Sequence, residues 1–581
     1  MRRYTYALLA LLLCAAGARA QNVPVQEVVL ENGLRVLMVP RKGDPNISAG
    51  WVTRTGSVNE RPGITGLSHL FEHMMFKGTR TVGTKNIEEN LKVLKEMDDV
   101  RAQIRSEEKE LIRRARLGEV ADTKDPKART ARHQQLIARF EELTKREREL
   151  MVKNEFDSIY TKAGGSGMNA GTSYDFTVYF INVPANKLEL WFWMESDRLL
   201  NPVFREFYSE RDVVHEERRL RTDSTPTGKF DEQFDAMFWM SSPYGWPVVG
   251  WPSDLEGITR EEALEYFAVN YAPNNLTAAL VGDFEPARAT ELARKYFGRL
   301  PRGPREPEPV RTREMQQLAE QRMIAYAETS PQARVRYHTV ADGHPDDVAL
   351  SVLGSLLSGR TGRLYKSLVV QQEVANNSSA GQNGSKYEGY FELRGTAKPG
   401  KSPEEVEQAL YKEIERIQKE PVPADELQKI KNQSSANQFR GLQSNFGLLV
   451  QLLLRDANRG WATINTDPAR VQAVTPADIQ RVANKYFAPE NRTVAIYRTK
   501  TAAAAAGAAE DPALAGLSDQ EKAQIRQLRA ALPQMKAEQV RAVLQQVEQM
   551  GASAPADKQK GIQLVKKMLE DRLKQLEGGV K

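Results

Sequence analysis

Short apolar runs of strand length alternate with amphipathic helical stretches between Val25 and about Leu300. The clearest runs span residues 34–39, 176–183 and 276–282. Runs of this length are typical of strands, whereas apolar residues spaced three and four apart are typical of helices. The pattern predicts an α+β fold in which helices pack on a mixed antiparallel sheet.

The same style of pattern returns after a proline-rich segment. Residues 301–314 read PRGPREPEPVRTRE, which is typical of a linker, and a second block runs from 315 to 498. Both blocks end on a turn before an apolar strand: Tyr271-Ala-Pro-Asn-Asn275 before LTAALVGDF, and Tyr486-Phe-Ala-Pro-Glu-Asn491 before RTVAIY. This similarity predicts two homologous lobes, residues 21–300 and 315–498.

A densely charged segment at 87–159 interrupts the first lobe. Its apolar residues keep a helical spacing on both sides of a breaker zone at 118–126, which predicts an inserted helical hairpin. Two arms of about 30 residues would each reach roughly 45 Å. Three roles stay open for the hairpin: contact with another subunit, a place beside an active site, or a solvated decoration without a binding role.

The C-terminal part of the chain fits neither lobe. An Ala-rich linker is expected at 499–517, followed by an amphipathic, basic helical tail of coiled-coil character at 518–581. Its apolar residues could dock on the body of the protein or on a partner, and the sequence does not choose between the two.

The N-terminus has the charge, apolar core and small-residue end of a secretory signal peptide. Residues 1–20 read MRRYTYALLALLLCAAGARA, so Gln21 is expected to begin the mature chain. The apolar stretch is short for an uncleaved membrane anchor, and Leu13 before Cys14 argues against lipidation. We therefore expect an exported protein, periplasmic if the source is a Gram-negative bacterium.

Cys14 is the only cysteine in the chain. The mature protein therefore cannot use disulfides, a catalytic thiolate or a cysteine zinc site. Any metal must be held by His, Asp or Glu.

Overall composition narrows the class further. The chain has 581 residues with 40% hydrophobic and 27% charged residues, enough for two or more domains. The mean hydropathy of −0.54 argues against a multi-span membrane protein. Of the formal net charge of +6, Arg2, Arg3 and Arg19 belong to the signal segment, which leaves 6 − 3 = +3, so no nucleic-acid partner is expected. No apolar run of about 20 residues follows the signal segment, so no membrane span is expected in the mature chain.

The strongest chemical signal is His69-Leu-Phe-Glu72-His73. On a helix, residues four apart share a face, so both imidazoles can bind one Zn²⁺ while Glu72 faces the attacking water. The chain has only 6 histidines, so a chance match is rare.

A catalytic zinc needs a third protein ligand, which here must be a carboxylate. The helix-like stretch Tyr208–Arg221, YSERDVVHEERRLR, places Glu210 and Glu217 two turns apart on one face, and Glu216 and His215 point elsewhere. By itself such a stretch is typical of a solvated charged face.

At these residues the sequence resembles the M16 metallopeptidases, the inverzincins that include pitrilysin, insulin-degrading enzyme and the mitochondrial processing peptidase. The resemblance covers about residues 25–498. It implies one Zn²⁺ on His69, His73 and Glu217, with Glu72 as general base and Glu210 supporting the site from behind the ligands. The gap between HxxEH and the third ligand is longer than usual for the family, and the predicted hairpin accounts for the excess.

A second phrase agrees with this family. Residues 164–179, GGSGMNAGTSYDFTVY, resemble its edge strand, which implies that Asn169 and Ala170 lie beside a bound peptide. There the substrate is expected to join the sheet as an extra strand, held by backbone hydrogen bonds.

One departure from the family bears on partners. Its second half carries an Arg and a Tyr, seven residues apart, that bind substrate carbonyls, and here Val369 and Asn376 stand at those places. A two-lobed chain is also half of the family's closed four-lobed chamber. A second M16-like subunit, in a hetero- or homodimer, is therefore expected to supply the Arg and Tyr.

The expected function is that of a zinc endopeptidase acting on peptides or unfolded segments. The alternative is a catalytically inert M16-like binding or assembly subunit, which the missing Arg and Tyr keep open. Hydrolysis of a non-peptide substrate is less favoured, because the edge strand suggests binding of an extended backbone.

Overall fold

The computed structural model describes residues 22–500 and, further on, residues 517, 521–522, 525, 528–529, 532, 535, 537–553 and 558–578. The expected signal peptide with Cys14 and the start of the mature chain at Gln21 lie outside the described residues. So do most of the Ala-rich linker and much of the first part of the tail. By contacts, the described residues up to Met323 form one unit with Gln332–Ile496, and Ile324–Pro331 form a second unit with the described residues from Tyr497 onward.

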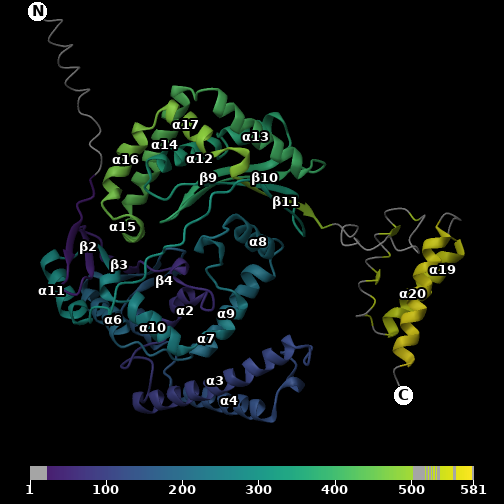
Figure 1. Cartoon of the computed structure of the whole chain (residues 1–581), viewed down its shortest axis with the longest axis horizontal. Coiled ribbons are helices and arrows are strands. Elements are labelled where there is room, and N and C mark those ends of the chain that lie inside the picture. The colour runs from purple at the N-terminus through teal and green to yellow at the C-terminus, as the bar shows by residue number, and fades with distance from the viewer. Residues whose placement is uncertain are drawn as a thin grey trace, which may run out of the picture. The chain divides into compact units, whose positions relative to one another are not determined.

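The first lobe is built on a six-stranded sheet, of which β2, β3 and β4 are labelled in Figure 1. The strand order is β1-β2-β6-β3-β5-β4, and all neighbours are antiparallel except the parallel pair β2 and β6. The strands are β1 Gln26–Val29, β2 Arg35–Pro40, β3 Asn46–Thr53, β4 Ser166–Thr172, β5 Thr177–Pro184 and β6 Leu276–Gly282. β6 is inserted between β2 and β3, and β4, which pairs only with β5, lies at one edge of the described sheet.

Helices of the same lobe cover one face of this sheet. Those of the first lobe outside the hairpin are α2 Leu67–Met74, α5 Glu155–Lys162, α6 Leu188–Leu200, α7 Phe207–Arg218, α8 Gly228–Phe238, α9 Pro252–Gly257, α10 Arg260–Asn270 and α11 Pro286–Tyr296. Trp51 of β3, Phe71 of α2 and Trp191 of α6 are at most 1% exposed in their common core. The mixed α/β architecture agrees with the α+β fold that the hydrophobic pattern predicts.

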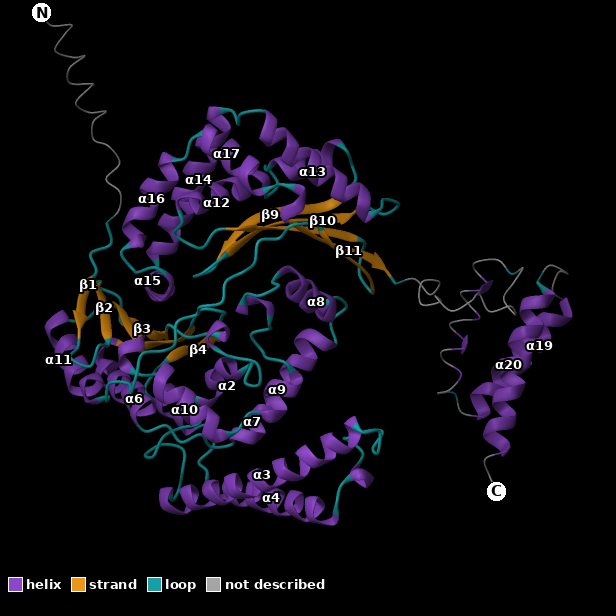
Figure 2. Ribbon diagram, viewed as in Figure 1, coloured by secondary structure: helices purple, strands orange, loops and turns teal. Residues whose placement is uncertain are grey.

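The second lobe repeats the design with five strands in the order β7-β11-β8-β10-β9 (Figure 2). The strands are β7 Gln321–Ala327, β8 Gln332–Thr339, β9 Ala375–Gly384, β10 Gly389–Ala397 and β11 Arg492–Thr499. The helices are α12 Pro345–Leu357, α13 Pro403–Lys419, α14 Ala424–Gln443, α15 Asn445–Asn458, α16 Thr463–Ala473 and α17 Pro476–Tyr486. One face of the sheet shares a core with α12, α13 and α17.

Each lobe also places a helix on the sheet of the other. Leucines of α15 pack on the face of the first sheet that its own helices leave open, against residues such as Val52 and Val281. At the end of α15, Asp456 accepts hydrogen bonds from Arg35, Arg54 and Thr277. The first sheet is thereby buried on both faces, which explains why β6 is buried at every position.

The reciprocal contact is made by α8. Asp231 and Asp235 of this helix pair with Arg334 and Arg336 of β8. Beside them the ring of Phe238 stacks on His338, with ring centroids 3.9 Å apart. The two lobes are therefore joined by exchanged helices as well as by the connecting segment.

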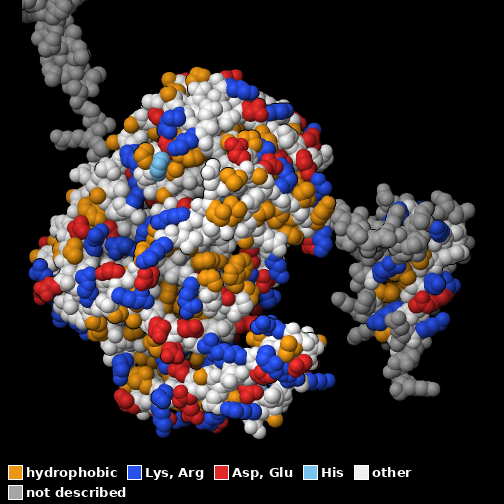
Figure 3. Space-filling model, viewed as in Figure 1, with side chains coloured by type: hydrophobic (Ala, Val, Ile, Leu, Met, Phe, Trp, Pro, Cys, Tyr) orange, Lys and Arg blue, Asp and Glu red, His pale blue; other side chains and the backbone are white. Residues whose placement is uncertain are grey.

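The inserted hairpin is present, with arms α3 Ile87–Arg116 and α4 Ala131–Leu150. Asn86 and Thr130 cap the two helices through their side chains. The hairpin lies along α7 in Figure 1, and on the face seen in Figure 3 its basic and acidic side chains are intermixed. Its apolar side is buried in the core of the first lobe through Val93, Met97 and Leu143. This packing is the reason the hairpin forms a stable part of the lobe.

The predicted helical tail is present in the second unit as α19 Ala537–Ser553 and α20 Gln559–Gly578. The two helices pack on each other through Val540, Val547 and Leu569. Of the helices that the structure describes, none is long and apolar enough to cross a membrane.

Candidate metal centre

The HxxEH sequence lies on α2, whose first turn is held by a buried carboxylate. Glu60 accepts hydrogen bonds from the backbone N–H groups of Gly66, at 2.8 Å, and Ser68, at 2.6 Å. Gly66 has φ +90°, and a Cβ there would lie 2.6 Å from the carbonyl oxygen of Val249, so only glycine fits. The start of α2, and with it the direction of its histidines, is fixed by these contacts.

The side chains of His69, His73 and Glu217 converge between α2 and α7. One ligand atom from each lies within 4.8 Å of the others. The Oε2 atom of Glu217 is 3.3 Å from Nε2 of His73 and 3.7 Å from Nε2 of His69. Two imidazoles and a carboxylate are a donor set typical of a catalytic zinc site. Among the described residues, no other group of three such side chains meets this spacing.

The neighbouring carboxylate of Glu210 reaches the far side of His73. Its Oε2 atom lies 3.4 Å from Nδ1 of His73, and the opposite ring nitrogen faces Glu217. Such a contact orients the imidazole and selects its tautomer. On the same helix, Glu216 is exposed and pairs with Arg219. The structure therefore brings Glu210 and Glu217 to α2 and leaves Glu216 outside.

The pKa values of the two histidines are shifted in opposite directions. Burial lowers the pKa of His69, against the opposing charges of Glu72 and Glu217. Burial also acts to lower the pKa of His73, but the hydrogen bond and charge of Glu210 outweigh it and raise that pKa. Because a metal binds the neutral imidazole, the lowered pKa of His69 favours metal binding, and the raised pKa of His73 opposes it.

Glu72 lies on the same helix and has a partner that spacing does not reveal. The hydroxyl of Thr172, the last residue of β4, donates to Oε2 of Glu72 at 2.7 Å. Thr172 stands in the same phrase as Asn169 and Ala170, but its contact with α2 depends on how the sheet edge meets the helix. The contact aims the carboxylate of Glu72 towards β4.

Lys77 and Arg221 also border the site, and the sequence analysis missed both. Lys77 pairs with Glu206 and Glu210, and Arg221 forms an ion pair with Oε1 of Glu217 at 2.6 Å. Lys77 lies just beyond the end of α2 at Met74, so helix periodicity gives no signal for it. Burial opposes its charge, but Glu210 and Glu206 raise the pKa of Lys77.

The two proposed peptide-binding residues lie on the outermost strand of the first sheet. Asn169 pairs with Phe180 and Ala170 with Tyr179, so β4 uses one edge on β5 (Figure 2). In the sheet that the structure describes, β4 is terminal, and its other edge has no strand beside it.

The residues at the places of the family's Arg and Tyr lie in the second lobe. Val369 is partly buried against the core of that lobe. The side-chain amide of Asn376 donates to the carbonyl of Ala397 at 3.5 Å. The side chain of Val369 thus packs in the second lobe, whereas Asn376 is exposed.

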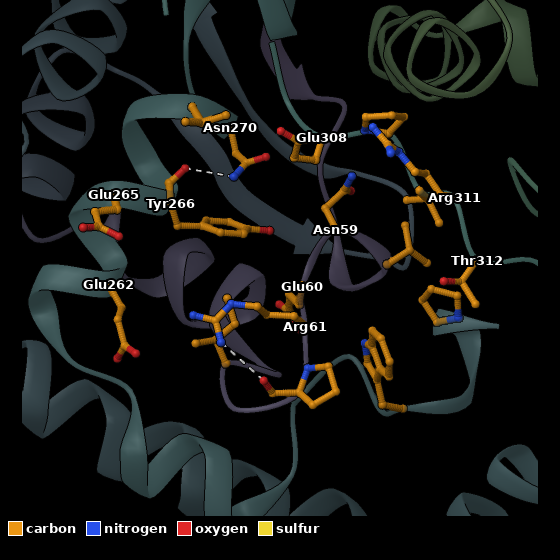
Figure 4. A pocket seen from close by; sticks show the side chains of 18 of the residues that line it. Asn59, Glu60, Arg61, Glu262, Glu265, Tyr266, Asn270, Glu308, Arg311 and Thr312 are labelled. Atoms are coloured by element: carbon orange, nitrogen blue, oxygen red, sulfur yellow. Dashed lines mark hydrogen bonds between the residues drawn. The ribbon is translucent and has the colours of Figure 1, made fainter. Parts of the chain in front are cut away.

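A separate cavity of about 690 Å³ lies away from the metal cluster (Figure 4). It is bounded by residues 58–64, α10 and residues 305–312 of the connecting segment. Glu60 borders it and links it to the start of α2. Its charged residues are mixed in sign, with Arg61 and Arg311 opposed by Glu262, Glu265 and Glu308, so its lining indicates no ligand class.

Comparisons with known families agree with the fold. Residues 35–100 match the model "Insulinase (Peptidase family M16)", and residues 257–434 match "Peptidase M16 inactive domain". The chain is 26% identical over 489 residues to the zinc protease PqqE of Helicobacter pylori, covering 82% of this chain and 94% of that protein. It is 24% identical over 341 residues to a probable mitochondrial-processing peptidase subunit beta of Arabidopsis thaliana, covering 56% of this chain and 63% of that protein.

Solved structures show the same architecture. A protease from Helicobacter pylori superposes with a TM-score of 0.66 at 23% identity, covering 82% of this chain and 99% of that chain. The periplasmic protease PqqL from Escherichia coli superposes with a TM-score of 0.60 at 16% identity, covering 84% of this chain but 49% of that chain. These structures share the two-lobed fold, and the two family-model matches assign the chain to the M16 peptidase family.

Proposed function

We propose that the chain is a zinc-dependent endopeptidase that hydrolyses peptides or unfolded polypeptide segments. The observation that carries the proposal is the cluster of His69, His73 and Glu217, whose ligand atoms lie within 4.8 Å of one another. Glu72 stands on the same helix, within the HxxEH sequence. Relatives named zinc proteases, PqqE among them, support it.

The residues present fit one zinc ion. His69, His73 and Glu217 would hold the ion, and Glu210 would orient His73 from behind. Nδ1 of His69 is buried without a hydrogen-bond partner, so Nε2, which faces Glu217, is the nitrogen directed at the cluster. Bound zinc would supply Lewis acidity towards the scissile carbonyl and lower the pKa of the attacking water.

Glu72 is the proposed general base. Its carboxylate takes a proton from water as the water oxygen bonds to the carbonyl carbon, and returns that proton to the amine nitrogen as the C–N bond breaks. The hydrogen bond from Thr172 holds Glu72 at the end of β4, where the peptide is proposed to lie.

Substrate binding is assigned to the free edge of β4. An extended peptide there would pair with the backbone around Asn169 and Ala170, so affinity would depend little on its side chains. The same strand carries Thr172 and so brings a peptide on this edge to the proposed base.

The chain is proposed to act with a second M16-like subunit, identical or different. Val369 and Asn376 offer neither guanidinium nor phenol at the places where the family binds substrate carbonyls, so the partner would supply the Arg and Tyr and close the chamber. The signal-like residues 1–20 support export, and the periplasmic setting of PqqL favours the periplasm.

The competing proposal is an inert M16-like binding or assembly subunit. The same substitutions at Val369 and Asn376 favour it. The clustering of the three candidate ligands with Glu72 beside them favours the enzyme, because an inert subunit has no physical need to keep ligands and base together.

The decisive experiment is hydrolysis of a quenched, unstructured peptide pool by the zinc-loaded mature protein. We expect cleavage by the wild type, a loss of about 100-fold or more in Glu72→Gln with zinc content unchanged, and full activity in Glu216→Gln, an exposed glutamate of α7. Zinc content should fall in Glu217→Gln. Zinc bound without cleavage, with or without a copurifying subunit, would support the inert alternative.

A further inference from the structure

Both arms of the inserted hairpin contact the residues that start α7, the helix of the proposed third ligand. From α4, Glu147 accepts a hydrogen bond from the backbone N–H of Glu206 at 2.8 Å. From α3, Oδ1 of Asn90 accepts from Nε of Arg205 at 2.5 Å. Glu147 is 1% exposed and Asn90 fully buried, so these contacts are structural parts of the interior.

Glu206 has a backbone conformation that needs outside support. It precedes α7 with φ +54° and ψ +21°, in the left-handed region that a residue with a Cβ seldom occupies. No side chain of its own caps the helix. Glu147 therefore supplies the acceptor for an N–H that would otherwise be left without a partner where the chain turns into α7.

Arg205, which directly precedes Glu206, connects the start of α7 to the segment that follows α2. Its side chain is fully buried and donates to the carbonyl oxygens of Lys77, Thr79 and Val82. The end of α2, the start of α7 and both hairpin arms therefore meet at residues 205 and 206.

A chain of polar contacts continues from this junction to the metal cluster. Oε2 of Glu206 lies 3.1 Å from Nζ of Lys77, which also binds Glu210. Glu210 in turn contacts His73. Because α7 is a single helix, a change in how it begins would move Glu210 and Glu217 together relative to α2.

We propose that Glu147 is a positioning residue for the metal centre, and that the hairpin serves to fix the start of the third-ligand helix. This rests on the proposed zinc site and extends it to a segment outside the ligand set. The apolar side of the hairpin packs in the core of the first lobe, as expected of a segment that supports α7 from inside the protein.

The test is the zinc affinity of the full-length protein, measured by competition with a chromophoric chelator. Glu147→Leu keeps most of the side-chain volume but removes the hydrogen-bond acceptor. We expect its zinc affinity to fall on the order of tenfold, the smaller end of the loss usual when a residue that orients a metal ligand is removed. Glu147→Gln keeps an acceptor oxygen and should bind zinc almost as the wild type does.

Leu143→Ala is the matched control for loss of folding. Leu143 is buried on the same helix, one turn before Glu147, so this variant should lower the melting temperature but keep the zinc affinity of the folded protein. Wild-type affinity in Glu147→Leu would overturn the proposal, as would an equal loss of affinity in Leu143→Ala. The zinc site itself is tested separately with His69→Ala. If the wild type binds zinc no more tightly than His69→Ala does, the proposed zinc site is wrong, and this outcome is distinct from a failure of the Glu147 proposal.

Discussion

At the scale of single residues, the candidate site depends on one hydrogen bond that sequence spacing does not predict, the one between Thr172 and Glu72. HxxEH predicts which side chains share a helix face, and the cluster of His69 and His73 follows from that periodicity. The partner of Glu72, however, comes from residue 172, one hundred positions away. A hydroxyl donor at that place holds one oxygen of the proposed base and leaves the other for water.

Removing this hydroxyl should slow catalysis without weakening peptide binding. Thr172→Val keeps the shape of the side chain but frees Glu72 to rotate, so we expect kcat to fall about tenfold, the cost of a hydrogen bond to a charged group, with KM unchanged. Thr172→Ser should restore most of the rate. The check is steady-state kinetics on a quenched peptide, and an increase in KM alone would assign Thr172 to substrate binding instead.

At the scale of elements, the start of α2 is held by a carboxyl group that is buried away from water, that of Glu60. Burial raises the pKa of Glu60 to about 8, although the N–H groups of Ser68 and Gly66 act to lower it. The folded protein therefore holds this proton more tightly than the unfolded chain does. The stabilisation is complete below the unfolded pKa of about 4.5 and is lost as the pH rises through about 8.

We therefore expect the unfolding free energy of the apo protein to fall between pH 5 and 8 more steeply in the wild type than in Glu60→Gln. The slope from one such group is at most about 1.4 kcal/mol per pH unit. Urea unfolding across this range measures it, with Glu261→Gln, an exposed glutamate of α10, as the control. Identical slopes in wild type and Glu60→Gln would contradict a raised pKa at this position.

The elements themselves follow largely from local pattern. The helical hairpin is predicted by apolar spacing around a breaker zone, and it is present because that apolar side finds the core of the first lobe. Its role could not be predicted, since the three alternatives left open depend on what Glu147 and Asn90 touch. The structure places both at the start of α7.

At the scale of the whole molecule, the two lobes pack directly on each other in addition to being joined by the connecting segment. The face of the first sheet formed by residues such as Leu37, Val52 and Ala279 is covered by α15 of the second lobe. Without α15 that face would meet water, and an exposed apolar patch of this kind promotes association.

The first lobe expressed alone, residues 22–314, should therefore bind a hydrophobic dye and aggregate, whereas adding residues 315–500 should restore a soluble complex. Leu452→Asp, at a fully buried position of α15, should abolish this rescue. Val370→Asp, at a position 59% exposed, should not. Size-exclusion chromatography of the mixtures decides it, and a soluble, dye-free first lobe would show that α15 is dispensable.

The sequence by itself determined what is set within a few residues of chain: a helix with His69 and His73 on one face, a second with Glu210 and Glu217 on one face, a charged hairpin, and a repeated lobe. Helix and strand periods are local geometry, so they can be read from spacing. Only the tertiary structure decided that Thr172 meets Glu72, that Glu147 holds the start of α7, and that α15 covers the other lobe. Those contacts join distant segments, and they depend on how whole faces pack together to exclude water.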